Sequence, residues 1–158
     1  MKLLRLTRSL NPAGGGIAEG VRQIGPHLAA LGVTTTVASL DPPEAPWLQD
    51  QPFEAIGLGP VATGYGYRRS LPSRIRFLAQ QHDVVIIEGI WQYHAFATWR
   101  ALRGSAIPYF VYTHGMLDPW FKRTYPLKHL KKWAYWPWAD YRVLGDATAV
   151  LFTTEQER

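Results

Sequence analysis

The sequence predicts an α/β chain in which a doubly wound, mostly parallel sheet is flanked by helices. Short runs rich in β-branched residues alternate along the 158 residues with segments of helical periodicity. One of these runs, residues 84–87, is apolar without interruption, which is typical of a strand buried on both faces. A glycine-rich loop joins the first short run to the first helical segment. Together these observations favour six strands with helices between them.

Each element follows from a local pattern. Strands are expected over residues 2–7, 34–39, 53–58, 84–87, 108–112 and 149–152. Helices are expected over residues 18–31, 71–81, 93–102 and 127–143, the last interrupted by Pro137. In the first helix, one apolar face is expected from Val21, Ile24, Leu28 and Leu31, with a kink at Pro26. Segments 41–52 and 59–70 are expected to be loops, the second beside a site.

The composition limits the classes of protein to which the chain can belong. The length suits one domain, which we expect to span residues 1–158. The absence of cysteine excludes disulfides, thiolate zinc sites and cysteine nucleophiles. No apolar run approaches the roughly 18 residues that cross a membrane. Arg5 interrupts the first apolar run, which indicates a strand rather than a signal peptide.

Basic and aromatic residues are interleaved between positions 120 and 142, in a chain of formal net charge +5. The set consists of Lys122, Arg123, Lys128, Lys131, Lys132, Arg142, Trp120, Trp133, Trp136 and Trp138. This pattern suits an anionic membrane surface, where the rings lie at headgroup level. A solvated cationic face with aromatic rings packed into the core remains the alternative. A nucleic-acid partner is not expected.

The most informative motif is the loop Asn11-Pro12-Ala13-Gly14-Gly15-Gly16. Glycines allow positive φ and place no Cβ between the backbone and a ligand. The helix that follows offers unpaired N–H groups to a phosphate or carboxylate. A tight connection without a ligand stays open as the alternative. Glu19 breaks the dinucleotide fingerprint and Val21-Arg22 replaces the Lys-Ser/Thr of a P-loop, so neither class is supported.

Polar residues follow two of the expected strands at their carboxyl ends, where doubly wound sheets bind ligands. His114 follows strand 108–112, and its imidazole suits a phosphate or a sugar hydroxyl, although it would also serve as a strand cap. A second set follows strand 84–87 and suits a carbohydrate or nucleoside through stacking and hydrogen bonds: Glu88, Trp91, Gln92 and His94. Pairing of Glu88 with a basic residue, and a merely helical role for His94, stay open.

A third set contains Asp118, Lys122 and Arg123, of which the two basic residues suit a phosphate. Asp118 before Pro119 is equally typical of a helix N-cap. No metal site is expected, because the sequence lacks an Asp-x-Asp pair and an H-x-x-x-H spacing. The sequence also lacks the G-x-S-x-G elbow of serine hydrolases.

In their order and spacing, these motifs resemble the N-terminal half of a bacterial group 1 (family 4) glycosyltransferase. The resemblance rests on segments 9–16, 83–89, 113–117 and 149–158, and covers essentially the whole chain. It implies a Rossmann-like domain, one half of a GT-B architecture whose active site lies between two such domains. Segment 115–120 with 128–138 particularly resembles members from exopolysaccharide and lipopolysaccharide gene clusters.

The resemblance implies an acceptor-binding half of a retaining glycosyltransferase, which transfers a sugar from a nucleotide sugar to a glycan or lipid-linked acceptor. Gly14, Gly15 and Gly16 would approach the donor diphosphate, and His114 would be the active-site histidine. The acceptor would contact Glu88, Trp91, Gln92, His94, Asp118 and Arg123. No metal or other cofactor is expected. The implied localisation is cytoplasmic or peripheral on the inner face of the plasma membrane.

The family's donor-binding half, with its Glu-x7-Glu pair, has no counterpart in this sequence. We therefore expect a truncated chain, a gene fragment or a split subunit that is inactive alone, and its status as an enzyme stays open. The alternative is a stand-alone binding module for an anionic ligand or a membrane surface. A dinucleotide enzyme that uses Asp41 to bind a ribose is disfavoured by the broken glycine fingerprint.

Overall fold

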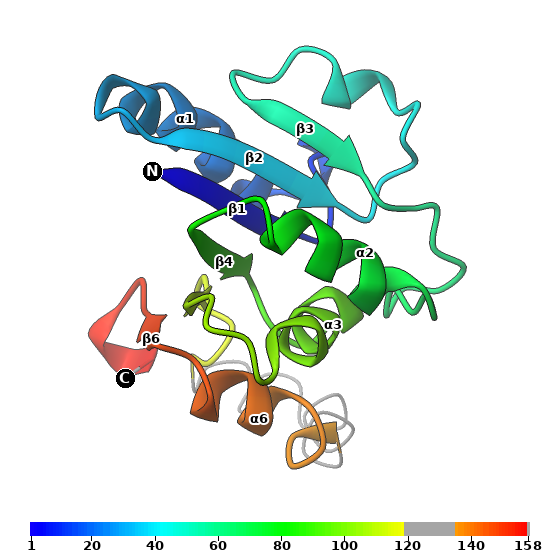
Figure 1. Cartoon of the computed structure of the whole chain (residues 1–158), viewed down its shortest axis with the longest axis vertical. Helices are drawn as coiled ribbons and strands as arrows, with labels where there is room; N and C mark the ends of the chain where they lie inside the picture. Colours follow the sequence, from blue (N-terminus) through cyan, green and yellow to red (C-terminus); the bar gives the residue numbers. More distant parts are fainter. Residues whose placement is uncertain (119–134, 158) are drawn as a thin grey trace.

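The computed structural model describes residues 1–118 and 135–157. Its centre is one six-stranded, all-parallel sheet with the strand order β3-β2-β1-β4-β5-β6 (Figure 1). The strands are β1 (Lys2–Thr7), β2 (Thr34–Ser39), β3 (Glu54–Gly57), β4 (Val84–Glu88), β5 (Tyr109–Tyr112) and β6 (Ala149–Leu151). The predicted doubly wound α/β class is confirmed. The order reverses between β1 and β4, which makes the gap beyond their carboxyl ends the switch point of the sheet.

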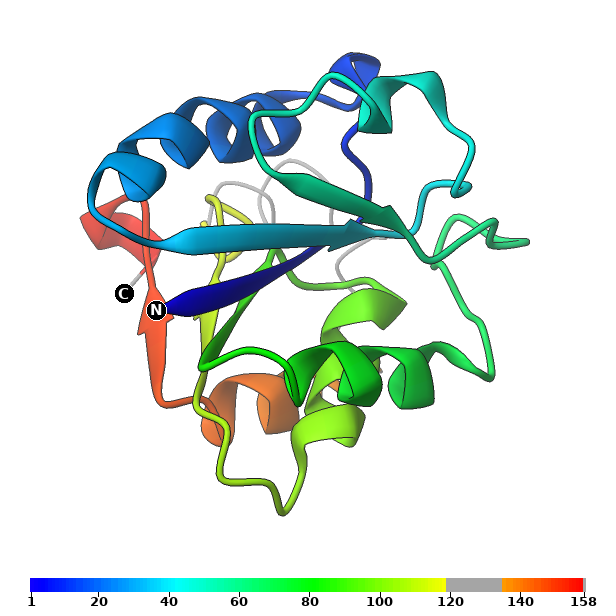
Figure 2. The ribbon, with the colours of Figure 1, turned by 45° about the horizontal axis from the view of Figure 1, so that its top comes forward.

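Helices cover both faces of this sheet (Figure 2). On one face lies α1 (Gly16–Ala30), and on the other lie α2 (Leu71–Ala79), α3 (Tyr93–Leu102) and α6 (Asp140–Gly145). Three 3-10 turns complete the described elements: η1 (Pro12–Gly14), η2 (Pro46–Leu48) and η3 (Glu155–Glu157). Residues 127–134 of the predicted helix 127–143 lie outside the described residues, and in the remainder a turn over 136–139 precedes α6.

Two apolar clusters hold the layers together. The larger one lies under α2 and α3, where Leu4 and Leu6 of β1 are buried, and the smaller one lies under α1 around Val21 and Val37. Successive side chains of a strand point to opposite faces. Arg5, between Leu4 and Leu6, therefore lies on the α1 face of the sheet.

The predicted apolar face of the first helix is only partly right: Val21 is buried and Leu28 is half-buried, but the other two residues face solvent. Ile24 and Leu31 are 41% and 80% exposed, whereas Ala18, Val21 and Gly25 are buried. A Cβ on Gly25 would lie 2.8 Å from the Phe53 ring, so the helix is closest to its neighbour where it has no side chain. The prediction counted only apolar side chains and therefore missed a glycine contact. The helix continues through Pro26 to Ala30.

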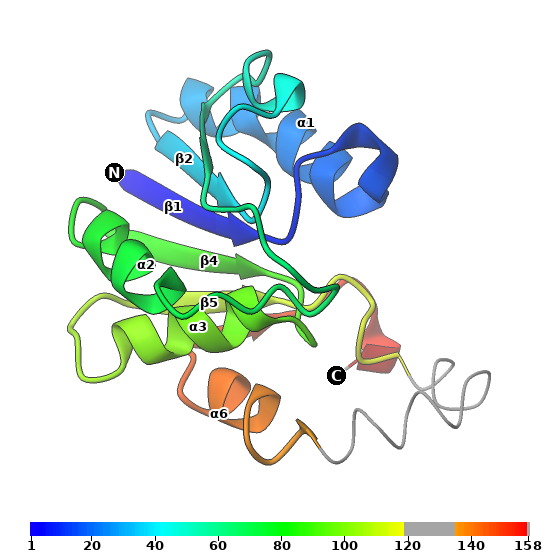
Figure 3. The same cartoon turned by 90° about the vertical axis from the view of Figure 1, so that its right-hand side faces the viewer.

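All strands run toward the same edge of the sheet, as Figure 3 shows. The loops after β1, β4 and β5 and the turn η3 gather there. The long loop 59–70 also passes this edge on its way from β3 to α2. The edge therefore contains the glycine loop (residues 11–16), the loop after β4 (residues 89–92, the Glu88 loop) and the loop after β5 (residues 113–118, the His114 loop).

Candidate functional site

A buried charge network occupies the switch point. Glu88, at the end of β4, accepts a hydrogen bond from Arg5 Nε on β1 through Oε1 at 2.6 Å. Its other oxygen, Oε2, lies 2.6 Å from His114 Nε2, just after β5. Glu88 is 1% exposed and Arg5 4% exposed. The Glu88 carboxylate thus connects β4 to β1, the two strands that border the switch point, and also binds the histidine that follows β5.

The neighbours of Glu88 determine the ionisation state of its carboxyl. Burial would raise the pKa of the Glu88 carboxyl, but the hydrogen bond from His114 and the charge of Arg5 together hold that pKa below its ordinary value. The ionised carboxylate accepts a hydrogen bond from Nε2–H of His114, and Nδ1 of the ring has no hydrogen bond to the described residues. The His114 side chain is 16% exposed, and its ring also stacks on the ring of Tyr112 with centroids 4.1 Å apart. His114 is therefore held through Nε2 and through its ring face, and its Nδ1 has no partner among the described residues.

Backbone conformation marks the same edge of the sheet. In residues 1–118 and 135–157, the non-glycine residues with positive φ are Trp91 (69°) and His114 (52°). Left-handed backbone at such residues costs of order 1–3 kcal/mol and tends to cluster at functional sites. Both residues were candidates from the sequence, and both lie in loops beyond the carboxyl ends of strands. This strain supports a site at the switch point.

The glycine loop is anchored at one end and open at the other. Asn11 Oδ1 accepts a hydrogen bond from Ala13 N at 2.9 Å, and Gly14 N donates to Asn11 O at 2.8 Å. Gly15 has φ 103°, and Cβ atoms at Gly14, Gly15 and Gly16 would meet nothing within 4 Å. The loop therefore exposes backbone directly before the first turn of α1, where an anion would be favoured.

Asp41 supplies the anchor of this loop. Its buried carboxylate accepts hydrogen bonds from Ser9 Oγ at 2.6 Å, Leu10 N at 2.7 Å and Ser39 Oγ at 2.7 Å. Ser9 Oγ in turn accepts from Asn11 N at 3.0 Å. Because these three donors occupy its carboxylate, Asp41 positions the glycine loop. The structure therefore gives no support to a role for Asp41 at a ribose.

Three loops meet at the switch point. A Cβ on Gly89, after β4, would lie 2.9 Å from Met116 Cε and 3.6 Å from Ile17 Cδ1. Met116 belongs to the loop after β5, and Ile17 to the first turn of α1. Gly89 has φ 83°, so both its conformation and its surroundings require glycine. The glycine loop, the Glu88 loop and the His114 loop are thus brought together by packing.

The remaining acceptor candidates lie in different surroundings. Trp91 is half-buried; its indole donates to Met116 O at 3.2 Å and its ring lies 5.3 Å from that of Trp136. Gln92 is half-buried and precedes the first residue of α3, and Asp118 is half-buried at the end of the His114 loop. His94 is 1% exposed and its Nε2 donates to Glu88 O at 3.0 Å, so it faces the interior in this structure. Arg123 and Lys122 lie outside the described residues.

Sequence reasoning missed Arg5 and Glu157. Glu157 is 6% exposed and accepts hydrogen bonds from the hydroxyls of Thr113 (2.8 Å) and Thr153 (2.6 Å) and from Leu117 N (3.3 Å), which ties η3 to the His114 loop. A charge inside the apolar run of the first strand is a signal that could have indicated Arg5. Glu157 offers no such signal, because its partners are 40 or more residues away in the chain except for its neighbour Thr153.

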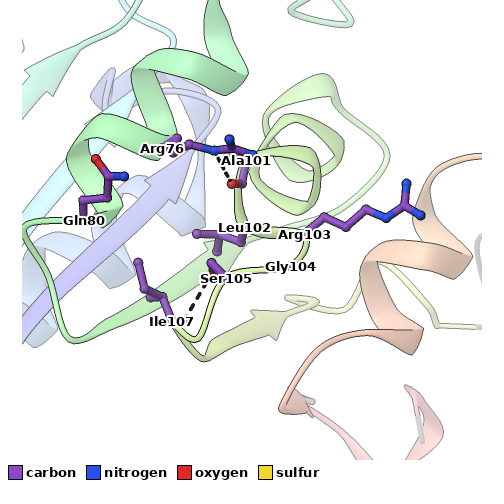
Figure 4. Close-up of a pocket in the computed structure, with 8 residues that line it drawn as sticks. All are labelled: Arg76, Gln80, Ala101, Leu102, Arg103, Gly104, Ser105 and Ile107. Atoms are coloured by element: carbon purple, nitrogen blue, oxygen red, sulfur yellow. Dashed lines mark hydrogen bonds between the residues drawn. The ribbon is translucent and has the colours of Figure 1, made fainter.

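A hollow at the opposite edge of the sheet contains none of these residues. It is lined by Arg76, Gln80, Leu102, Ser105 and Ile107, among others, where α2 and α3 end and β5 begins (Figure 4). Arg76 there donates to Ala101 O at 2.9 Å. Because ligands of doubly wound sheets bind at the carboxyl edge, this amino-edge hollow is a poor candidate for the site.

The described residues offer neither a metal site nor a membrane-spanning helix. Among residues 1–118 and 135–157, no three His, Asp or Glu side chains gather closely enough to hold a metal ion. None of the described helices has the length and apolar character needed to cross a bilayer.

Comparison with known proteins identifies the family. The model of the Glycosyl transferase 4-like domain matches residues 15–158. No curated protein matches the chain at a significant level. The family match begins within the glycine loop, at Gly15, and covers Glu88 and His114, but it does not include Arg5.

Several solved structures share the fold. A sucrose-phosphate synthase from Thermosynechococcus elongatus superposes with a TM-score of 0.68 at 17% identity, covering 94% of this chain and 41% of that one. A UDP-N-acetylglucosamine 2-epimerase assigned in Listeria monocytogenes gives 0.58 at 14% identity, covering 99% and 39%. A glycosyltransferase from Rickettsia africae gives 0.52 at 16% identity, covering 82% and 34%.

These likenesses concern the fold, and the chain spans roughly two fifths or less of the length of each structure. The parallel-sheet topology, the fold shared with these structures and the family model agree with one another and with the resemblance seen in the sequence. The chain belongs to the family of Glycosyl transferase 4-like domains.

Proposed function

We propose that this domain is the acceptor-binding half of a retaining glycosyltransferase, which moves a sugar from a nucleotide sugar to a glycan or lipid-linked acceptor in cell-surface polysaccharide synthesis. The observation that carries the proposal is His114, held by Glu88 at the switch point where the exposed glycine loop also meets the sheet edge. A donor-binding partner domain would complete the site, and the domain alone would be inactive.

In this proposal each part of the site has one task. The backbone at Gly15 and Gly16, with the first turn of α1, stabilises negative charge on the donor diphosphate. His114 presents Nδ1 to a hydroxyl of donor or acceptor, while Glu88 and Arg5 hold its ring in place. Trp91 and Gln92 offer an aromatic face and an amide to the acceptor. The charges come from side chains and backbone, so the proposal needs no metal.

Contact with an anionic membrane surface is a second part of the proposal. Trp138 and Tyr141 are 70% and 63% exposed at the start of α6, next to the exposed Arg142. Exposed aromatic rings beside basic residues suit the headgroup region of a membrane. We therefore place the protein in the cytoplasm, peripheral to the inner face of the plasma membrane, where a lipid-linked acceptor would be within reach. The same surface would serve a stand-alone binding module.

Ligand-detected NMR on the 158-residue chain tests the proposal. UDP, GDP and their sugars should bind weakly, and binding should be lost in His114→Ala and Gly15→Val. Valine at Gly15 meets open space but is strained at φ 103°, so the change reshapes the loop alone. Gly20→Ala is the matched control, because Gly20 lies in α1 with nothing within 4 Å of its Cβ position. Absence of nucleotide binding by a folded chain would contradict the assigned role of the glycine loop.

A further inference from the structure

We propose that Arg8 and the tyrosines of loop 59–70 form a subsite for a sugar that carries an anionic group, a phosphate or a carboxylate. The subsite lies on the α2–α3 side of the carboxyl edge, beside the Glu88–His114 site. This inference rests on the proposed function, because it specifies the chemical class of acceptor that the domain receives.

Arg8 follows β1 directly and is half-buried beneath loop 59–70. A Cβ on Gly66 of that loop would lie 3.7 Å from Arg8 Nε and 3.9 Å from its Cδ. The guanidinium makes no hydrogen bond or ion pair with the residues that the structure describes. Segment 119–134 contains no Asp or Glu, so it supplies no carboxylate. Arg8 is thus a half-buried cation without a counter-ion in the described chain.

The carboxylates at this edge already have partners of their own. Asp41 is bound by the glycine loop, Glu88 by Arg5 and His114, and Glu157 by the His114 loop. A guanidinium withdrawn from water without compensation is unfavourable, and an anion that binds it by two parallel hydrogen bonds restores what solvation it has lost. The local charge therefore favours an anionic ligand at Arg8.

His94 provides a second polar group without a partner. Its ring is 1% exposed, and since Nε2 donates to the Glu88 carbonyl, Nδ1 is an acceptor that has no partner in the described chain. Burial lowers the pKa of His94 to about 4, and the charge of nearby Arg8 contributes to this shift. The neutral ring adds no competing charge. Because the ring is buried, its unmatched acceptor suits a bridging water.

Tyrosines flank Gly66 and present an aromatic surface beside the cation. Tyr67 is 54% exposed, and its ring centroid lies 4.8 Å from that of Tyr93 on α3, which lies 5.6 Å from that of Tyr65. Tyr93 N donates to Tyr65 O at 2.8 Å and fixes the loop to α3. An exposed ring can stack on the apolar face of a sugar while Arg8 binds its anionic substituent. Stacking and charge together define the subsite.

Titration of the 158-residue chain with glucose 1-phosphate, glucuronate and glucose, followed by amide shifts, tests the subsite. The anionic sugars should bind about ten- to a hundredfold more tightly than glucose. Arg8→Gln should abolish this preference, Arg8→Lys should keep part of it, and Arg69→Gln, at an exposed arginine of the same loop, should leave it unchanged. The stronger of the two anionic sugars identifies the phosphate or the carboxylate as the group recognised.

Equal binding of the three sugars by the folded chain, or an unchanged preference in Arg8→Gln, would overturn the subsite. Binding of UDP to the same samples separates this result from the proposed function. Diphosphate binding should persist in Arg8→Gln, because the glycine loop does not depend on that side chain. If the chain binds UDP but shows no preference for anionic sugars, the subsite alone is disproved. If the folded wild-type chain does not bind UDP, the donor-side role of the domain is disproved.

Discussion

Replacing Glu88 by alanine should lower the free energy of unfolding by about 3–5 kcal/mol, because it leaves the buried guanidinium of Arg5 without its partner. The same change removes the 2.6 Å contact between Glu88 Oε2 and His114 Nε2. Ligand binding that depends on the position of the His114 ring should therefore also be lost. Urea denaturation of the variant and the wild-type chain measures the first effect.

Two controls show whether burial causes the Glu88 effect. The Arg5→Met/Glu88→Leu double variant removes both charges and should recover most of the lost stability. Glu19→Ala breaks an ion pair of the same 2.6 Å length whose side chains are about half exposed, and should cause little measurable change. A Glu88→Ala variant as stable as Glu19→Ala would contradict the network described here.

Replacing Glu157 by glutamine should destabilise the domain at neutral pH by about 1–3 kcal/mol, because a neutral amide replaces a charged acceptor of four hydrogen bonds. Burial would raise that pKa, but hydrogen bonds from Thr153, Thr113 and Leu117 N lower it from 4.5 to about 2. A depressed pKa stabilises the folded state above 4.5, and the stabilisation is lost as pH falls toward 2. The difference in stability between the wild-type and variant chains should therefore shrink over this range.

The control for this prediction is Glu155→Gln, which removes an exposed carboxylate two residues away. Its stability should follow that of the wild-type chain at every pH. A pH-independent gap between the wild-type chain and Glu157→Gln would show that η3 is held by packing and not by the charge of Glu157. Chemical denaturation at a series of pH values gives both curves.

Local patterns were sufficient for most of the fold. The strands over Lys2–Thr7 and Thr34–Ser39 and the helix over Tyr93–Leu102 have the predicted bounds, because β-branched runs and helical periodicity are properties of neighbouring residues. The buried face of α1 was not predictable in this way. Gly25 is buried because Phe53, which lies far along the chain, packs against it.

The sequence could predict where the site residues lie, but it could predict fewer of the residues that they contact. Parallel topology places strand ends at one edge, so the sequence could select Glu88, His114 and the glycine loop together. Their chemistry depends on contacts across 83 residues for Arg5 and Glu88 and across 31 residues for Asp41 and Leu10 N. Such pairings follow from the strand order, which no single motif specifies. The proposed roles of these residues toward donor and acceptor remain predictions.

We expect ligands to bind at the carboxyl edge, between the glycine loop and His114. Amide chemical-shift mapping of the 158-residue chain with UDP shows where they bind. We expect the largest shifts at Gly14, Gly15 and Gly16 and at His114, with little change over residues 104–107 of the amino-edge hollow. Shifts confined to that hollow would show that the site does not lie at the carboxyl edge.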